Sequence, residues 1–229
     1  MRIAVIGTGR MGTALGNQLV LAGHEVRVGS RDPERGRRFA ALMHASFGGG
    51  YQEAAAGAPA VVLAVPWAAV WDTIVRLGEL EGVIVIDVMN PFREGSDSEQ
   101  QEFPGSSAAE QLQALLPRAS VVKAWNTTYS GVVHRSPDFD GVVASVFVAS
   151  DDPEAKEAVA SLVRDVGYEP VDTGPLSSAR YLEPLAGLMT ALDRLSGGEV
   201  EHAFKLLTRK RAPRPAAAQE ERTIAEPTT

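Results

Sequence analysis

The feature that most constrains this chain is a glycine-rich turn between an apolar run and a helical pattern. Residues 2–6 (RIAVI) are apolar enough for a buried strand, and Gly7-Thr8-Gly9-Arg10-Met11-Gly12 follows at once. Apolar residues then recur at helical spacing, at Met11, Ala14, Leu15, Leu19 and Ala22. A strand, a G-x-G-x-x-G turn and a helix, in that order, are the fingerprint of dinucleotide-binding folds. We expect residues 7–12 to hold a pyrophosphate at the helix N-terminus, where backbone N–H groups point at the anion.

The end of the next apolar run indicates which dinucleotide binds. An NAD enzyme usually has Asp or Glu roughly 20 residues beyond the fingerprint, to hold the ribose 2′-hydroxyl. This chain has Gly29-Ser30-Arg31 there, and Arg35 follows one helical turn later. A hydroxyl and two guanidinium groups suit a 2′-phosphate, so we predict NADP. Asp32 could still bind a ribose hydroxyl, but its position before Pro33 favours capping a helix.

Composition excludes several classes of protein. The chain has 229 residues, is 45% hydrophobic and contains no cysteine, so a disulfide scaffold, an iron–sulfur cluster and thiol catalysis are excluded. The four histidines lie too far apart for a metal site, and we predict no metal. The net charge of -7 argues against nucleic acid as a partner. Apolar stretches of about 18 residues and a signal peptide are both missing, so we expect a cytoplasmic protein without a membrane partner.

Strand-like and helix-like runs alternate along most of the chain. This pattern predicts an α/β fold with a doubly wound, mostly parallel Rossmann-type sheet and a short C-terminal helical segment. We expect one domain over residues 1–208 and a disordered tail over 209–229, where Ala, Pro and charged residues dominate. The polar stretch 93–106 predicts a mobile loop. The expected strands after the first are 24–28, 45–47, 60–65, 83–87, 120–124, 144–149 and 168–171; the expected helices after the first are 33–43, 67–77, 107–116, one from 153, and 177–195 with a kink or break at Pro184.

Unusual residues follow three of the predicted strands. They are Val65-Pro66-Trp67, Asn90-Pro91 and Asn126-Thr127-Thr128. Ligands of doubly wound sheets bind outside the carboxyl ends of the strands, so we expect these residues at the rim of the site. Asn126 either binds the polar edge of a ring or caps the helix that follows. We interpret Glu183 as a surface or capping residue, and we predict no acid/base pair, because hydride transfer between two stacked rings needs mainly orientation and exclusion of water.

Taken together, these segments resemble a known family. Gly7-Thr8-Gly9, Gly29-Ser30-Arg31, Val122-Lys123-Ala124, the segment 171–176 (VDTGPL) and the closing Phe204-Lys205-Leu206-Leu207 are similar to the NADPH-dependent coenzyme F420 reductases over residues 1–208. The resemblance implies a homodimer of single domains that transfers a hydride between NADP and a deazaflavin bound in one cleft. It also implies cofactor contacts at Ala64, Val65 and Pro66, and acceptor contacts at Trp67, Asn90, Pro91, Asn126, Thr127, Leu176 and Leu207.

The chain departs from this family at Asn126, where a His is typical of the deazaflavin pocket. The flavin-using domains of membrane ferric reductases resemble it more closely there, with Asn-Thr. The small-molecule acceptor is therefore coenzyme F420, a flavin or another compound. A non-enzymatic NADP sensor is the alternative from another class. Imine reductases share the N-terminal half, but too few residues follow Pro175 for their large helical dimerisation domain.

Overall fold

The protein is built around a parallel sheet of six strands. A computed structural model describes residues 1–93 and 103–209 of the chain. The strand order is β3-β2-β1-β4-β5-β6, and every neighbouring pair in this sheet is parallel. The order runs outward from β1 in both directions, as in doubly wound folds. The bounds are Arg2–Ile6 for β1, Glu25–Gly29 for β2, Phe47–Gly49 for β3, Ala60–Leu63 for β4, Ile84–Asp87 for β5 and Ser120–Lys123 for β6.

Helices cover both faces of this sheet. Alternate residues of β1 point to opposite faces, so that Ile3 and Val5 join one core cluster while Ala4 and Ile6 join the other. The first face is covered by α1 (Arg10–Leu21), α2 (Pro33–Met43), α6 (Ser130–Arg135) and α7 (Pro153–Asp165). The second face is covered by α3 (Tyr51–Ala55), α4 (Val70–Leu77) and α5 (Ala108–Leu115). Because both faces are buried, the strands are almost entirely apolar.

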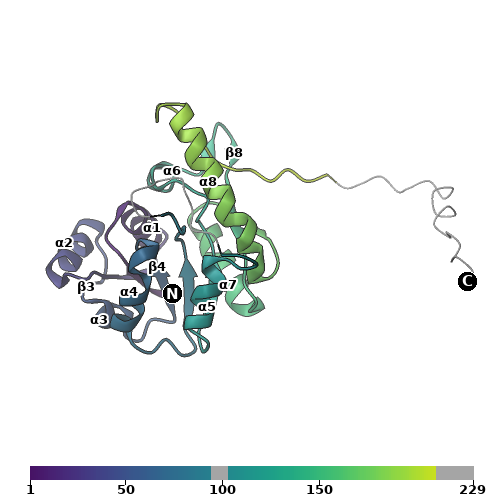
Figure 1. Ribbon diagram of the computed structural model, residues 1–229. Helices are drawn as coiled ribbons and strands as arrows, with labels where there is room; N and C mark the ends of the chain where they lie inside the picture. Colours follow the sequence, from purple (N-terminus) through teal and green to yellow (C-terminus); the bar gives the residue numbers. More distant parts are fainter. Residues whose placement is uncertain (94–102, 210–229) are drawn as a thin grey trace, which may run out of the picture.

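The C-terminal third extends this sheet beyond β6. The strands β9 (Ser145–Val148) and β10 (Glu169–Asp172) form a parallel pair, and an antiparallel bridge between Lys123 and Ala149 joins them to β6. A small antiparallel hairpin, β7 (Asp138–Phe139) and β8 (Val142–Val143), precedes them. The short 3-10 helices are η1 (Trp67–Ala69) and η2 (Leu176–Ser178), and α8 (Ala179–Leu195) ends the helical part (Figure 1).

The predicted fold class is confirmed, but some elements differ from expectation. The strand predicted at 45–47 is Phe47–Gly49 and includes two glycines. A Cβ added at Gly48 would lie 2.5 Å from the carbonyl oxygen of Gly36, so α2 packs against β3 more closely than any side chain would allow. The sequence interpretation also missed α3, α6 and the β7–β8 hairpin, which are all short.

Of the kink or break predicted at Pro184, the break is wrong, because α8 runs through this residue, and the kink stays a prediction. Pro184 removes one backbone hydrogen bond from the second turn of the helix. The residues just before Pro184 make tertiary contacts: the carbonyl group of Leu182 accepts a hydrogen bond from Asn126, and the carboxylate of Glu183 binds Lys123. These contacts attach this turn of α8 to the rest of the protein.

Two predictions lie mostly or wholly in parts of the chain that the structure does not describe. These are the mobile loop at 93–106, of which residues 94–102 lie outside the described ranges, and the disordered tail at 209–229, of which only residue 209 is described. The domain boundary at residue 208 stays a prediction. Within residues 1–93 and 103–209, none of the helices combines the length and the apolar character needed to cross a membrane.

Candidate functional site

The residues expected to bind ligands lie at the carboxyl edge of the central sheet. The glycine-rich turn leaves β1, and the loops that begin at Ala64, Val88 and Ala124 leave β4, β5 and β6. These four strands are neighbours and parallel, so their carboxyl ends share one edge. The predicted site residues on the four loops are therefore brought together.

Each glycine of the turn has a distinct geometric role. Gly7 has φ +118, and a Cβ there would lie 2.2 Å from the carbonyl oxygen of Ala64, so only glycine fits. A Cβ on Gly12 would lie 2.1 Å from the carbonyl oxygen of Gly7, which explains the close contact between α1 and the turn. A Cβ on Gly9 would meet nothing within 4 Å. Gly9 thus faces open space, where a ligand can approach the backbone.

The first turn of α1 is prepared to bind an anion. Gly9 is the N-cap of this helix and supplies no side-chain hydrogen bond, and the first turn contains no acidic residue. The first backbone N–H groups of a helix have no partner inside the helix, and the helix dipole favours negative charge there. Open space at Gly9 and uncapped N–H groups fit the pyrophosphate of a dinucleotide.

Asp32 caps the start of α2. Its Oδ1 accepts a hydrogen bond of 3.0 Å from the backbone N–H of Glu34, at the start of α2. The capping role predicted for Asp32 is confirmed. Ser30, which precedes it, is 5% exposed, and its Oγ accepts a bond of 3.3 Å from the Asp32 N–H.

The two arginines predicted for the 2′-phosphate line two different hollows. Arg35 donates from Nε to Thr8 Oγ1 at 2.6 Å and from Nη2 to the Thr8 carbonyl oxygen at 3.2 Å, and its guanidinium lies 5.1 Å from the centre of the Phe39 ring. This places Arg35 beside the glycine-rich turn, at a hollow of about 550 Å³. Arg31 lines a second hollow of about 280 Å³ together with Ser30.

The hollow beside Arg35 also contains residues that the sequence interpretation did not select. Thr13 of α1, Phe39 of α2, and Ser130 and His134 of α6 line it with the predicted Thr8, Gly9, Arg10 and Arg35. Phe39 lies four residues after Arg35 on one helix, and this spacing could have revealed it. The α6 residues could not be found from sequence, because the approach of α6 to α1 is a tertiary contact.

The loop after β4 first lies against the glycine-rich turn and then lines an aromatic hollow. Ala64 donates its N–H to the Ile6 carbonyl oxygen at 2.9 Å, Val65 is buried, and Pro66 is exposed before η1. Trp67 makes an edge contact with Phe103 at a centroid distance of 5.8 Å and an interplanar angle of 83°. The hollow around these rings has about 640 Å³ and is lined by Trp67, Ala68, Val70, Trp71, Phe92, Arg93, Phe103, Gln111 and Leu115.

Asn90 and Asn126 connect the loops after β5 and β6. Asn90 donates from Nδ2 to the Asn126 carbonyl oxygen at 2.8 Å, and Asn126 donates from Nδ2 to Asn90 Oδ1 at 3.0 Å. Asn126 does not cap the next helix, because α6 begins at Ser130 with Tyr129 as its N-cap. That alternative is wrong. Pro91 and Thr127, the neighbours of this pair, are buried.

Two residues that the resemblance assigned to the acceptor lie apart from these loops. Leu176 is 1% exposed and packs in the core cluster on the α4 and α5 side of the sheet. Leu207 is 82% exposed. It follows a segment that runs along β9, where Ser145 donates its N–H to the Phe204 carbonyl oxygen at 2.8 Å. Within one chain, the structure gives Leu176 a packing role and leaves Leu207 on the surface.

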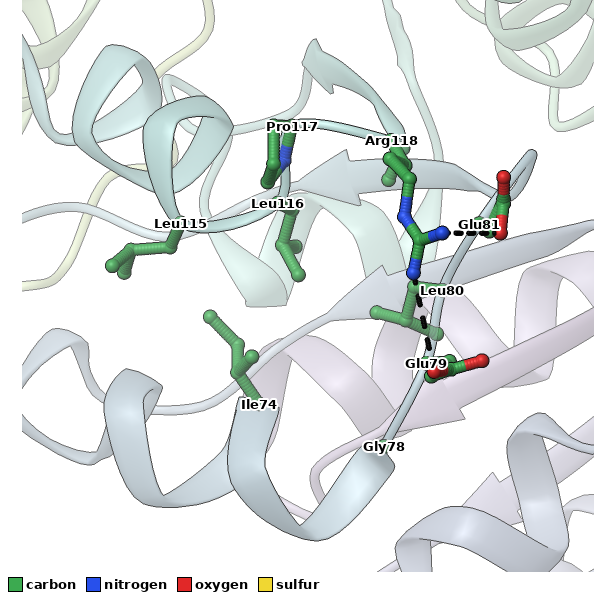
Figure 2. A pocket seen from close by; sticks show the side chains of 10 residues that line it. Ile74, Gly78, Glu79, Leu80, Glu81, Leu115, Leu116, Pro117 and Arg118 are labelled. Atoms are coloured by element: carbon green, nitrogen blue, oxygen red, sulfur yellow. Dashed lines mark ion pairs between the residues drawn. The ribbon is translucent and has the colours of Figure 1, made fainter.

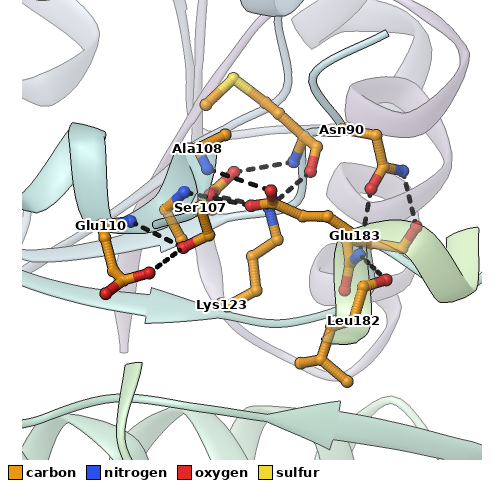
Figure 3. A network of polar contacts seen from close by, with 11 residues as sticks. Asn90, Ser107, Ala108, Glu110, Lys123, Leu182 and Glu183 are labelled. Atoms are coloured by element: carbon orange, nitrogen blue, oxygen red, sulfur yellow. Dashed lines mark hydrogen bonds and ion pairs between the residues drawn. The ribbon is translucent and has the colours of Figure 1, made fainter. Parts of the chain in front are cut away.

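Asp87, Lys123 and Glu183 form a buried charge network beside the loops that follow β5 and β6. Lys123 Nζ donates to Asp87 Oδ2 at 3.0 Å, to the Met89 carbonyl oxygen at 2.7 Å and to Glu183 Oε1 at 3.2 Å (Figure 3). Lys123 and Asp87 are fully buried and Glu183 is 3% exposed. Burial lowers the pKa of Lys123, but the two carboxylates outweigh this effect and hold the pKa above its ordinary value. Lys123 is therefore charged at neutral pH.

Glu183, a residue of α8, also caps the start of another helix, α5. Its carboxylate oxygens accept hydrogen bonds from the backbone N–H groups of Ala108 at 3.0 Å and Ala109 at 3.1 Å, in the first turn of α5. The predicted capping role is confirmed and the surface position is wrong. The sequence did carry one signal for this network, since Asp87 and Lys123 are charged residues at the ends of otherwise apolar strands.

The hollow between α4 and α5 lies at the other edge of the sheet. It has about 200 Å³ and is lined by residues that precede β5 and β6, such as Leu80 and Ala119 (Figure 2). Arg118 at its rim pairs with Glu81 at 2.8 Å and Glu79 at 3.9 Å. Because it faces the amino ends of the strands, we do not assign it to the site.

Comparison with known proteins agrees with this geometry. The family model for "NADP oxidoreductase coenzyme F420-dependent" matches residues 2–91. The F420-dependent NADP reductase of Methanothermobacter thermautotrophicus is 30% identical over 84% of this chain and 89% of its own length. A putative F420-dependent NADP reductase from Arthrobacter sp. FB24, solved by crystallography, is 31% identical in sequence with a TM-score of 0.81. The match covers 91% of this chain and 100% of that chain.

Other relatives share part of their length or only the fold. Metalloreductase STEAP3 of Rattus norvegicus is 32% identical over 80% of this chain, but the chain spans only 36% of that protein. An imine reductase from Aspergillus terreus is 19% identical with a TM-score of 0.63 and shows a common fold alone. Identity and coverage together show that the chain belongs to the family of F420-dependent NADP reductases.

Proposed function

We propose that the protein transfers a hydride between NADP(H) and the deazaflavin ring of coenzyme F420. One observation carries this proposal: the open turn at Gly9 and the Asn90–Asn126 pair lie on loops at the same edge of the sheet. NADPH would supply the hydride, and the protein would supply binding, orientation and exclusion of water. An acid/base pair is not required.

The proposed cofactor contacts are those of the turn and of the loop after β2. The N–H groups of Arg10, Met11 and Gly12 begin α1 and would bind the pyrophosphate. Ser30, Arg31 and Arg35 would bind the adenosine 2′-phosphate, with Thr8 holding the Arg35 guanidinium. Ala64, Val65 and Pro66 would lie under the nicotinamide half.

The proposed acceptor contacts are Trp67, Asn90, Pro91, Asn126 and Thr127 on the three strand-end loops. A flavin is the second candidate acceptor, because Asn126-Thr127 resembles the flavin-using domains of membrane ferric reductases, and the metalloreductase STEAP3 is as similar to this chain as the F420 reductases are. The F420 reductases match over nearly their whole length, which favours F420.

The experiment is to mix the purified protein with NADPH and, in separate reactions, with F420, FMN and FAD, and to follow nicotinamide absorbance. We expect the fastest oxidation with F420. The Gly9→Ala variant serves as the control for turnover that does not require bound cofactor. Oxidation with FMN or FAD but not F420 would favour the flavin, and none with any of the three would favour an NADP sensor.

A homodimer is also proposed. Tyr181, Leu188 and Leu195 of α8 are 78%, 52% and 86% exposed, and their spacing of seven residues puts them on one face of the helix. Large apolar residues gathered on one exposed face favour association. Sedimentation equilibrium measures the mass, and Leu188→Asp is expected to lower it to that of one chain.

A further inference from the structure

The side chain of Asn126 is held by two other segments of the chain. Its Nδ2 donates to Asn90 Oδ1 at 3.0 Å and to the Leu182 carbonyl oxygen at 2.9 Å. Leu182 belongs to α8 and Asn90 to the loop after β5; both are drawn in Figure 3. The Asn126 amide therefore uses both of its N–H donors inside the protein.

These contacts fix which way the amide faces. A half-turn of the amide would bring Oδ1 against Asn90 Oδ1 and the Leu182 carbonyl oxygen, which are both acceptors, so the opposite orientation is excluded. The Leu182 carbonyl group is itself held in place, because the next residue, Glu183, is bound to Lys123 and to the first turn of α5. The buried charge network thus positions Asn126.

The remaining polar atom of this side chain has no partner. Asn126 is 5% exposed, and its Oδ1 is buried and accepts no hydrogen bond from the part of the chain that the structure describes. A buried acceptor without a donor is costly and calls for a cause. Trp125, the residue before it, has φ 54, a left-handed conformation that is rare for a bulky residue and that gathers at functional sites.

We infer that Asn126 Oδ1 accepts a hydrogen bond from an amide-type N–H group of a bound molecule. Hydrogen bonds in enzyme sites are often completed only in the complex, which accounts for a covered oxygen in the free chain. Two molecules of the proposed reaction carry such a group: the carboxamide of nicotinamide and the ring imide of a flavin or deazaflavin. The inference rests on the proposed function for the second source. Acceptors without an N–H group, such as quinones, would gain nothing from Asn126.

The test uses the unaltered protein and two matched pairs of ligands. One pair is NADPH and its 3-acetylpyridine analogue, which replaces the carboxamide nitrogen with a methyl group. The other is riboflavin and 3-methylriboflavin, measured with NADP present, in which the imide hydrogen is replaced. Fluorescence titration gives the dissociation constants, and we expect one pair to differ by roughly tenfold or more. The Asn126→Leu variant should lose this difference, and a thermal melt shows whether that variant is folded.

Each outcome decides the inference. A difference in the riboflavin pair assigns Oδ1 to the acceptor, and a difference in the NADPH pair assigns it to the cofactor. Equal constants within both pairs, or no binding of any of the four compounds, would overturn the inference, whether or not Asn126→Leu folds. A difference in the NADPH pair without hydride transfer to F420 or flavins would leave the inference standing and remove the proposed function.

Discussion

Replacement of Lys123 by Met tests the buried charge network most directly. Met has a similar length and no charge, so the cavity stays filled while the ammonium group disappears. Asp87 Oδ2, Glu183 Oε1 and the Met89 carbonyl oxygen each lose a donor now 2.7 to 3.2 Å away. Two carboxyl groups that share one cation would then face each other in a site without water contact.

The expected loss of stability follows from this geometry. Breaking a buried ion pair by removing one partner costs about 3–5 kcal/mol, because an uncompensated charge stays buried. Native domains are stable by only about 5–15 kcal/mol, so the variant should be severely destabilised at neutral pH. Mild acid should restore part of the loss, since a protonated carboxyl group costs less to bury than a carboxylate.

Urea unfolding of both proteins at neutral and mildly acidic pH measures these free energies. A matched control is Arg76→Ala, which removes a pair with Asp72 whose side chains are 51% and 54% exposed. The control should lose less than about 1 kcal/mol. If Lys123→Met also lost less than about 1 kcal/mol, the argument that this network holds the site together would be refuted.

Three further predictions concern the cofactor and pH. Gly9→Ala should abolish NADPH binding with an unchanged melting temperature. Gly12→Ala should lower the melting temperature, because its Cβ would lie 2.1 Å from a carbonyl oxygen. These roles would be contradicted if both variants changed the NADPH affinity and the melting temperature to the same extent. Arg35→Ala should lose roughly 1.5–3 kcal/mol of the preference for NADPH over NADH, while Arg38→Ala, a change at an exposed residue of the same helix, should keep this preference. Equal dissociation constants of the parent protein for NADPH and NADH would contradict a 2′-phosphate site. Burial raises the pKa of Tyr168, and the carboxylates raise the pKa of Lys123, so the folded protein keeps both groups protonated to higher pH than the unfolded chain does. The free energy of unfolding should therefore fall as the pH rises above about 10. A free energy of unfolding that stays constant above this pH would contradict the prediction.

Local sequence was sufficient to predict the fold class and the glycine-rich turn that we propose binds the cofactor. The apolar run 2–6, the glycines at 7, 9 and 12, and the periodic pattern after them each specify the backbone of their own segment. Asp32 before Pro33 likewise predicted a helix start, because a cap and its helix are adjacent in the chain. Such features need no knowledge of distant residues.

The polar contacts around the site depend on residues that are far apart in the sequence. Asp87, Lys123 and Glu183 are 36 to 96 positions apart, and their spacing gave no sign that one ammonium group would bind both carboxylates. The sequence also gave no sign that the carbonyl group of Leu182 would fix Asn126, or that the helix would continue through Pro184. The parallel sheet and the glycine-rich turn could be predicted from the sequence alone, since they follow from local backbone preference. The orientation of Asn126 depends on α8 returning to the ends of β5 and β6, and only the folded chain brings those groups within hydrogen-bonding distance.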